Sequence, residues 1–276
     1  MNDKQELGSK TAKGGFRNEV DIVKKFNNWK TDRDSQDWLK IMGYDINAIQ
    51  NIEAIIVPTI LSKKKIEEFK IEEEDYYEFV KFKKADAQIR IFIRVANILK
   101  IENLSLKKAN ESFGYNQLDK RPVATYQSIW NFDDSISLWL KLFTGELNYM
   151  QYLEEFEIEN FKSKKRVFIN EFPLLTQHRI IDFFAQNRIL VVSDIIKGRG
   201  GLSANWLLVT MRLANGVKRY CLKDINSAMN YYGSGEISVT PRGSLKIGRI
   251  TMQRKGGTPD PTSLQFKFNP NEVFNF

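Results

Sequence analysis

The sequence predicts an α/β protein, because helix-like and strand-like segments are interspersed along the chain. Residues 89–95 follow a period of two, which places their β-branched side chains on one face of a strand. Residues 16–29 instead space apolar side chains as an amphipathic helix does, with Glu19 and Asp21 favourably placed near its N-terminus. The chain has 276 residues, 42% of them hydrophobic and 12% aromatic, so it is long enough to bury a large core.

Local signals predict further elements in the N-terminal part. Residues 1–15 are polar and contain glycine, and we expect them to be partly unstructured or to act as an arm that contacts phosphates. Ser35 is the predicted N-cap of a helix over residues 36–42, which Gly43 ends. Residues 52–57 are predicted to form a short strand.

Residues 61–84 are a dense alternation of lysines and acidic residues with a few apolar positions. The pattern is typical of an exposed helix or helical hairpin stabilised by ion pairs. Two interpretations stay open for this segment, a solvated excursion or an element that contacts a partner or sets specificity.

The remaining elements follow from caps and periodicity. Pro122 is predicted to begin a helix that runs to Trp130, after a polar loop over residues 114–122. Asp133 and Thr176 are predicted N-caps, the first for a helix that ends near Gly145 and the second for residues 177–185. Strands are expected at residues 189–192, 206–213, 237–239, 245–252 and 264–268, with a helix at 224–231 among them.

Composition excludes several classes of protein. The single cysteine, Cys221, rules out an intrachain disulfide, and we expect it to be a buried structural thiol. The single histidine, His178, is too few for zinc fingers or paired-histidine phosphodiesterases, and no G-x-S-x-G motif accompanies it. Any metal site must therefore use oxygen ligands, which suits Mg²⁺.

The charge balance favours a polyanionic partner. The formal net charge is +8, and nucleic acid is the commonest partner of such a protein, although many basic proteins are merely soluble. No glycine-rich nucleotide-binding motif is present, so binding of a nucleotide cofactor is disfavoured. No RNA-binding motif is present either, which disfavours RNA binding. No apolar run reaches the length of a membrane span and no signal peptide is seen, so a cytoplasmic protein without membrane contact is expected.

One acid and one lysine frame a candidate metal-dependent nuclease site. Asp86 precedes the strand over residues 89–95, and a second strand over residues 104–107 places Ser105 and Lys107 on one face. A hairpin of these strands brings all three side chains to one end of a sheet. A carboxylate there can hold Mg²⁺ and an ammonium can orient or deprotonate water. The same spacing also occurs in ordinary sheets, so this pattern alone leaves both interpretations open.

Two groups of polar side chains are candidate DNA contacts. Residues 114–122 contain Asn116, Gln117 and Lys120, which are residue types that read base edges but are also normal in loops. The second group consists of basic side chains interleaved with glycine, which can contact phosphate oxygens or guanine. The same pattern also occurs on an ordinary solvated face, so both interpretations stay open. The candidates in the C-terminal third are Arg199, Arg242, Arg249, Arg254 and Lys255.

Ordered blocks of the sequence resemble the HinP-type restriction endonucleases, which cut GCGC. The blocks cover most of the chain except residues 61–84 and 147–165. They are ELGSKTAK at 6–13 with Asn18-Glu19, GYNQLDK at 114–120, FTGE at 143–146, 193–195 with 198–200, YGSG at 232–235, PRGS at 241–244, QRKGG at 253–257 and LQFK at 264–267.

The resemblance implies a type II restriction endonuclease with the PD-(D/E)xK core, a mixed β-sheet flanked by helices, and Mg²⁺ as cofactor. Asp86 falls on the metal-binding acid and Lys107 on the catalytic lysine, while Glu19 matches an acid near the metal site. Gln117 and Lys120 match the base-contacting loop, and we assign Asn116 to the same DNA contact. Ser105 stands where the family has glutamine and Ala85 where it has serine, and the backbone carbonyl of Leu106 is a further candidate ligand.

These observations predict Mg²⁺-dependent hydrolysis of double-stranded DNA at a short GC-rich palindrome, GCGC or an interrupted variant. Because of Ser105, a catalytically weak or inactive DNA-binding subunit of a restriction system is the alternative. We expect a single domain, with a catalytic part over about 1–145, a DNA-recognition part over about 166–276, and peripheral insertions at 61–84 and 147–165. The sequence leaves open a monomer or a homodimer, and a second restriction subunit.

Overall fold

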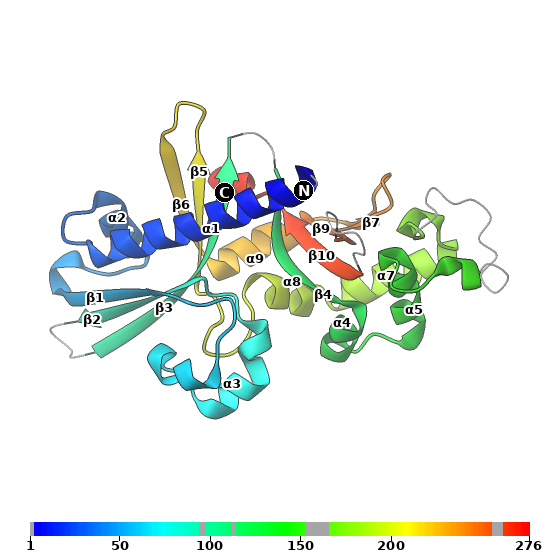
Figure 1. Cartoon of the computed structure of the whole chain (residues 1–276), viewed down its shortest axis with the longest axis horizontal. Coiled ribbons are helices and arrows are strands. Elements are labelled where there is room, and N and C mark those ends of the chain that lie inside the picture. The colour runs from blue at the N-terminus through cyan, green and yellow to red at the C-terminus, as the bar shows by residue number, and fades with distance from the viewer. Residues whose placement is uncertain (1–2, 94–97, 112–113, 153–165, 256–261) are drawn as a thin grey trace. The chain divides into compact units, whose positions relative to one another are not determined.

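The computed structural model describes residues 3–93, 98–111, 114–152, 166–255 and 262–276. The chain forms two compact units that interleave along the sequence (Figure 1). The mixed-sheet unit comprises Ser9–Gly114, Ile196–Met229 and Pro270–Phe276, and the antiparallel-sheet unit comprises Met1–Gly8, Tyr115–Ile195 and Asn230–Asn269. The assignment of catalytic and recognition parts stays a prediction.

The mixed-sheet unit contains a five-stranded sheet of order β1-β2-β3-β5-β6. All neighbouring strands are antiparallel except β3 and β5, which are parallel. The hairpin that was predicted to bring Asp86 and Lys107 together is formed by β2 and β3, which pair with Ala87 opposite Leu104. The strands are β1 (Ile49–Ile56), β2 (Ala87–Ile93), β3 (Ile98–Asn110), β5 (Trp206–Arg212) and β6 (Lys218–Asp224).

Two helices supply the core of this unit. The helices α1 (Asp3–Asn27) and α2 (Arg33–Ile41) contribute buried Ile22, Phe26 and Trp38, which form one cluster with Leu106 and other strand residues. The prediction that residues 1–15 are partly unstructured is wrong for residues 3–15, because the backbone is helical from Asp3; the good helix formers in this stretch outweigh its glycines. The predicted role as an arm that contacts phosphates stays a prediction, and residues 1–2 lie outside the described residues. Asp32, not Ser35, is the N-cap of α2, and its carboxylate accepts from the Ser35 N–H.

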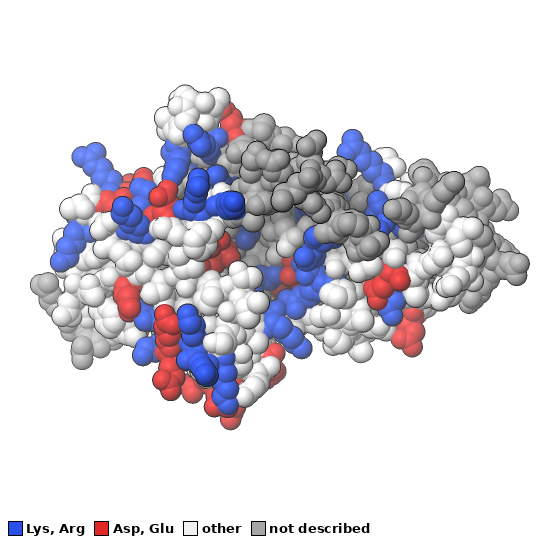
Figure 2. All heavy atoms as spheres, viewed as in Figure 1, with Lys and Arg blue, Asp and Glu red and all other residues white. Residues whose placement is uncertain are grey.

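The segment 61–84 forms short helical turns instead of one helix or hairpin. Its α-helix is α3 (Glu73–Phe79), and its 3-10 turns are η2 (Lys63–Lys65), η3 (Glu67–Phe69) and η4 (Val80–Phe82). Leu61, Ile66 and Phe69 are buried in a small core with Val57 and Leu202. The outer surface carries intermixed charges around α3 (Figure 2), including a Lys63–Glu73 ion pair of 2.5 Å. The segment is therefore packed on one side and solvated on the other.

The antiparallel-sheet unit has a five-stranded sheet of order β4-β10-β9-β8-β7. The predicted loop over residues 114–122 is wrong, since it contains strand β4, whose polar residues pair with β10. The predicted strand 245–252 is two strands, β8 and β9, joined by a turn at Gly248 with a φ of 58°. The strands are β4 (Asn116–Pro122), β7 (Ile237–Val239), β8 (Leu245–Ile247), β9 (Ile250–Arg254) and β10 (Ser263–Phe268).

Helices cover one face of this second sheet. Tyr126 and Trp130 of α4 (Val123–Trp130) stack at 4.5 Å between ring centroids, and both rings contact Phe266 edge-on. The helix α5 (Asp134–Thr144) begins and ends as predicted, because Asp133 accepts from the Ile136 N–H and Gly145 adopts a left-handed C-cap. In the described chain no helix combines the length and the apolar character needed to cross a membrane.

Two sequence predictions in this region are wrong. Residues 189–192 belong to the helix α8 (Arg188–Ile196), because the buried residues Val191, Val192, Ile195 and Ile196 share a helical face. Thr176 lies inside α7 (Leu174–Gln186), whose N-cap position is Pro173. The remaining helical elements are α9 (Ile225–Gly233), η1 (Ile46–Ala48), η5 (Tyr149–Gln151), η6 (Ile169–Glu171) and η7 (Pro270–Asn275).

Candidate active site

The backbone of Asp86 is fixed between two strands. Its N–H donates to the Leu104 carbonyl at 2.8 Å, and its carbonyl accepts from the Val57 N–H at 3.0 Å. Ala85 before it and Ala87 after it are fully buried. The Asp86 carboxylate therefore projects from a rigid position at the start of β2, and 29% of its side chain stays accessible to solvent.

Three groups of β3 converge on this carboxylate. Asp86 Oδ2 lies 2.7 Å from the Leu106 backbone nitrogen, 3.4 Å from Lys107 Nζ and 3.5 Å from Ser105 Oγ. Ser105 and Lys107 share a face of β3, as strand alternation requires. The structure thus brings together the three residues that the sequence pattern singled out.

Glu19 of α1 is electrostatically coupled to this group. Burial raises the pKa of Glu19 above its usual value, and the negative charge of Asp86 raises it further, while Lys107 and Lys83 act in the opposite direction. A positive charge placed between the two carboxylates favours their charged forms, because it offsets their mutual repulsion. A carboxylate with a perturbed pKa, such as Glu19, next to a lysine is typical of a functional site.

Lys83 is a site residue that the sequence analysis missed. Burial lowers its pKa, while Asp86 and Glu19 raise it and Lys107 again lowers it. Lys83 stands three positions before Asp86 within a run of lysines, so the sequence alone offers no signal that distinguishes it from Lys81 and Lys84. Only the tertiary structure shows that two lysines face two carboxylates here.

The oxygen atoms at this site fit a divalent cation. Within the described ranges no three His, Cys, Asp or Glu side chains cluster closely enough to hold a metal ion. A metal ion here would therefore rest on the carboxylates of Asp86 and Glu19 together with backbone oxygen and water. The Leu106 carbonyl faces the same strand edge as its own N–H, which donates to Asp86, because both groups of a strand residue point the same way. Carboxylate and carbonyl oxygens are the ligands that Mg²⁺ prefers.

The predicted base-contacting residues lie on one polar sheet face. Gln117 and Lys120 are three positions apart, so regular alternation would place them on opposite faces. A register shift in the β4–β10 pairing sets Gln117 opposite Lys267 and Lys120 opposite Gln265, and residues 265 and 267 share a face of β10. The irregular pairing therefore puts both exposed side chains on the same side.

Glutamine side chains cross three strands of this face. Gln265 Nε2 donates to Gln117 Oε1 at 2.6 Å, and Gln253 Nε2 donates to Gln265 Oε1 at 3.4 Å. Lys267 borders the row, and burial lowers its pKa. Sequence analysis did not single out Gln253, Gln265 or Lys267, although alternation in the predicted strand 264–268 places Gln265 and Lys267 on its polar side.

The predicted cations divide between the units. Arg199 lies in the mixed-sheet unit, where its guanidinium stacks 4.4 Å from the Phe82 ring centroid. The other predicted cations, including Arg249 stacked at 4.3 Å on Tyr231, lie in the antiparallel-sheet unit together with Asn116 of β4. These cations are Arg242, between β7 and β8, and Arg249, Arg254 and Lys255, in or beside β9. Burial lowers the pKa of Arg166 to about 10, and the charge of Arg254 at the end of β9 lowers it too, while Glu171 acts in the opposite direction.

The fold is that of a restriction endonuclease. A crystal structure of the restriction endonuclease MspI in complex with its cognate DNA matches the chain with a TM-score of 0.54 and 13% sequence identity, over 90% of this chain and 83% of that chain. The predicted α/β class with helices flanking a sheet is confirmed, although the structure has two sheets. A comparison with curated proteins found no match.

A family model settles the relationship. The model for the R.HinP1I restriction endonuclease matches residues 77–274, which include Asp86, Ser105 and Lys107. The chain belongs to the R.HinP1I restriction endonuclease family, and as a member it is a type II site-specific deoxyribonuclease. The predicted resemblance is thereby confirmed. Restriction endonucleases generally use a divalent metal ion, in agreement with the oxygen-rich site.

Proposed function

We propose that this endonuclease hydrolyses double-stranded DNA at a short GC-rich palindrome, GCGC or an interrupted variant, with Mg²⁺ as its cofactor. The observation that carries the proposal is the convergence of Lys107, Ser105 and the Leu106 N–H on Asp86. Glu19 adds a second carboxylate, and its raised pKa responds to Asp86. This donor set is suited to phosphodiester hydrolysis and to no histidine- or cysteine-based chemistry.

Each residue has a proposed role. Asp86 and Glu19 hold the metal ion, with the Leu106 carbonyl as a further ligand. When bound, Mg²⁺ supplies a Lewis acid that acidifies water and stabilises charge on the departing 3′-oxygen. Lys107 orients the attacking water or removes its proton, and its ion pair with Asp86 keeps its ammonium at the site. The Leu106 N–H fixes the Asp86 carboxylate against β3.

Ser105 is proposed as a supporting residue. Its hydroxyl lies 3.5 Å from Asp86 Oδ2, at the limit of a hydrogen bond, and its side chain is buried. A group in this position adjusts the orientation of Asp86 and is not needed as a ligand while two carboxylates and a carbonyl are available. The proposal therefore favours an active enzyme over the alternative of an inactive DNA-binding subunit.

The polar face of the antiparallel sheet is the proposed base-reading surface. Gln117 and Lys120 are exposed on it, and amides and ammonium groups match the donor and acceptor patterns of the major groove. The hydrogen bonds from Gln265 to Gln117 and from Gln253 to Gln265 fix the orientation of each amide. Among the nearby cations, Arg242 is the leading candidate for a base contact. Phosphates would mostly be contacted by Arg249, Arg254 and Lys255. Asn116 and Arg199 are proposed as further DNA contacts.

Double-stranded DNA is the proposed partner, met in the cytoplasm, with the protein acting as a monomer or a homodimer. Binding should then weaken with salt, with a log–log slope of about −0.9 for each contacted phosphate. An affinity that does not respond to salt would contradict a DNA interface.

Digestion of a fully sequenced phage DNA tests the proposal. Purified protein is incubated with the DNA and Mg²⁺, and the ends of the fragments are sequenced. Discrete fragments that share one GC-rich palindrome are expected, and Asp86→Ala should abolish cutting while metal-free binding persists. Wild-type protein that binds in a gel shift but leaves the DNA intact would support the inactive subunit instead.

A further inference from the structure

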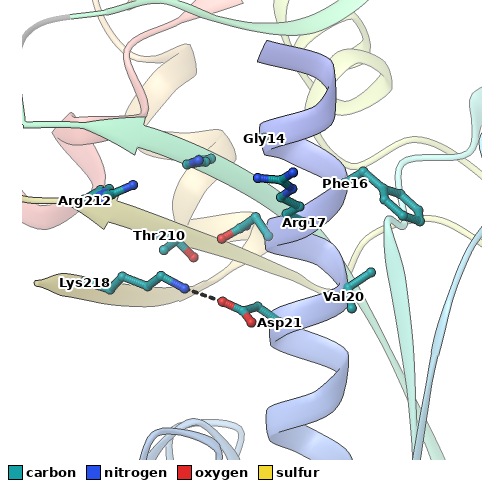
Figure 3. A pocket seen from close by; sticks show the side chains of 10 residues that line it. Gly14, Phe16, Arg17, Val20, Asp21, Thr210, Arg212 and Lys218 are labelled. Atoms are coloured by element: carbon teal, nitrogen blue, oxygen red, sulfur yellow. Dashed lines mark hydrogen bonds and ion pairs between the residues drawn. The ribbon is translucent and has the colours of Figure 1, made fainter. Parts of the chain in front are cut away.

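A surface pocket of about 470 Å³ lies between α1 and the ends of β3, β5 and β6 in the mixed-sheet unit (Figure 3). It is distinct from the candidate active site, because strand alternation directs Lys107 and Lys108 to opposite faces of β3 and only Lys108 lines the pocket. Arg17 and Asp21 extend from α1 toward the strands, and Arg212 and Lys218 extend from β5 and β6.

The lining of the pocket is strongly positive. Four cations, Arg17, Lys108, Arg212 and Lys218, line it together with a single carboxylate, Asp21, which forms an ion pair with Lys218. Arg212 and Lys218 are directly opposite each other across an antiparallel strand pair. Like charges in that position repel, so the pairing is unfavourable unless an anion offsets it. The arrangement suits a ligand with more negative charge than Asp21 provides.

A buried hydroxyl points to a ligand independently of the charges. Thr210 is 2% exposed and lines the pocket, with its side chain directed into the space between Arg17 and Lys218 (Figure 3). Among the described residues no group forms a hydrogen bond with Thr210 Oγ1. Buried hydroxyl groups are normally hydrogen-bonded, and leaving one unsatisfied is unfavourable. An oxyanion in the pocket would accept this hydrogen bond.

A glycine of α1 lines the pocket beside Lys108. Gly14 lies within the continuous helix α1 and lines the pocket, although glycine lowers helix stability. A methyl group at Gly14 would lie 3.3 Å from Lys108 Nζ, closer than ordinary packing. The ammonium of Lys108 therefore lies close to the helix backbone at Gly14, on the lining of the pocket.

We propose that this pocket binds a phosphate group, with Arg17, Lys108 and Arg212 neutralising it and Thr210 donating a hydrogen bond. Forked guanidinium groups and a hydroxyl donor are the groups that recognise a tetrahedral oxyanion. Resting on the proposed function, we assign the phosphate to the backbone of a DNA strand, outside the scissile position. A free phosphate ion offers the same chemistry. Two measurements distinguish the sources, because only a DNA phosphate makes the pocket contribute to the salt dependence of DNA binding.

The first measurement is calorimetric titration of inorganic phosphate into the full-length protein without divalent metal. Wild-type protein should bind phosphate, and Thr210→Val should weaken the affinity roughly ten-fold or more, because a hydrogen bond to a charged acceptor is lost. Thr31→Val is the matched control, since its exposed hydroxyl caps the turn at Asn28 outside the pocket. A melting curve verifies that Thr210→Val stays folded, which is expected because an unpartnered hydroxyl contributes no hydrogen bond.

The second measurement is DNA binding at several salt concentrations, again without metal. Arg212→Gln should reduce the log–log salt slope by about 0.9, the contribution of one phosphate, while the exposed control Arg33→Gln should not. A loss of phosphate affinity with an unchanged DNA slope would assign the pocket to free phosphate. If neither phosphate affinity nor the salt slope responds to Thr210→Val and Arg212→Gln, the pocket is not a phosphate site. Both measurements are independent of cleavage, so an inactive enzyme would contradict the proposed function and leave this inference standing.

Discussion

The amide N–H of Leu106 donates to the carboxylate of Asp86 at 2.7 Å, across the point where the β2–β3 pairing ends. The bond continues the ladder of the hairpin with a side chain in place of a backbone carbonyl. It therefore holds the acid in register with Ser105 and Lys107. The rate of cleavage should therefore depend strongly on the charge of Asp86 and weakly on groups that only support its position.

Replacement of Asp86 by asparagine should reduce cleavage at least about a hundred-fold, because the amide retains the hydrogen bond from Leu106 but lacks the charge that holds a cation. Cleavage rates under single turnover and DNA affinity without metal are the measurements. Asp37→Asn is a suitable control, since Asp37 is exposed on α2 and pairs with Lys40. Cleavage within ten-fold of wild type would remove Asp86 from the metal site.

Ser105→Ala should reduce cleavage only by about two- to ten-fold, because the hydroxyl lies 3.5 Å from the Asp86 carboxylate, at the limit of a hydrogen bond, and so long a bond contributes only about 1 kcal/mol. The measurement is the single-turnover rate at saturating Mg²⁺. A hundred-fold loss with unchanged DNA binding would show that Ser105 takes part directly in the chemistry.

Glu19→Gln should stabilise the metal-free protein at neutral pH. The folded-state pKa of Glu19 is raised above its usual value of 4.5, so the folded state binds the proton more tightly than the unfolded state does. Wild-type stability is therefore lost as pH rises from 4.5 through the folded-state pKa, and the neutral glutamine avoids this loss. Below pH 4.5 both side chains are neutral and the difference should vanish.

Denaturant unfolding at several pH values with a chelator present measures this effect. The same substitution should weaken Mg²⁺-dependent cleavage, because a proposed ligand is removed. A variant as stable as wild type at every pH would show that neither burial nor Asp86 destabilises the charged form of Glu19.

Gln117→Ala and Arg249→Gln should separate base reading from phosphate binding. Loss of the Gln117 amide should reduce discrimination against one altered base pair by about 1–3 kcal/mol, while Arg249→Gln should weaken all sequences alike and lower the salt slope by about 0.9. Competition binding with single-substituted duplexes measures both. An equal loss on every duplex for Gln117→Ala would exclude it from base recognition.

Much of the active-site hairpin follows from local sequence. The period of two in residues 89–95 and the placement of Ser105 and Lys107 on one face require only strand geometry, and the structure brings both to Asp86 as expected. The boundaries of α5 likewise follow from cap chemistry at Asp133 and Gly145. Such features depend on a few neighbouring residues, so the sequence by itself determined them.

Contacts between distant segments decided the rest. Residues 116–122 are too polar to indicate a strand, and they become β4 only through pairing with β10. The irregular pairing of those strands, and not alternation, places Gln117 beside Lys120. Glu19 and Lys83 join Asp86 because packing brings α1 and the end of the 61–84 segment to β2. These arrangements are fixed by pairing and burial across long sequence separations, which no local pattern encodes.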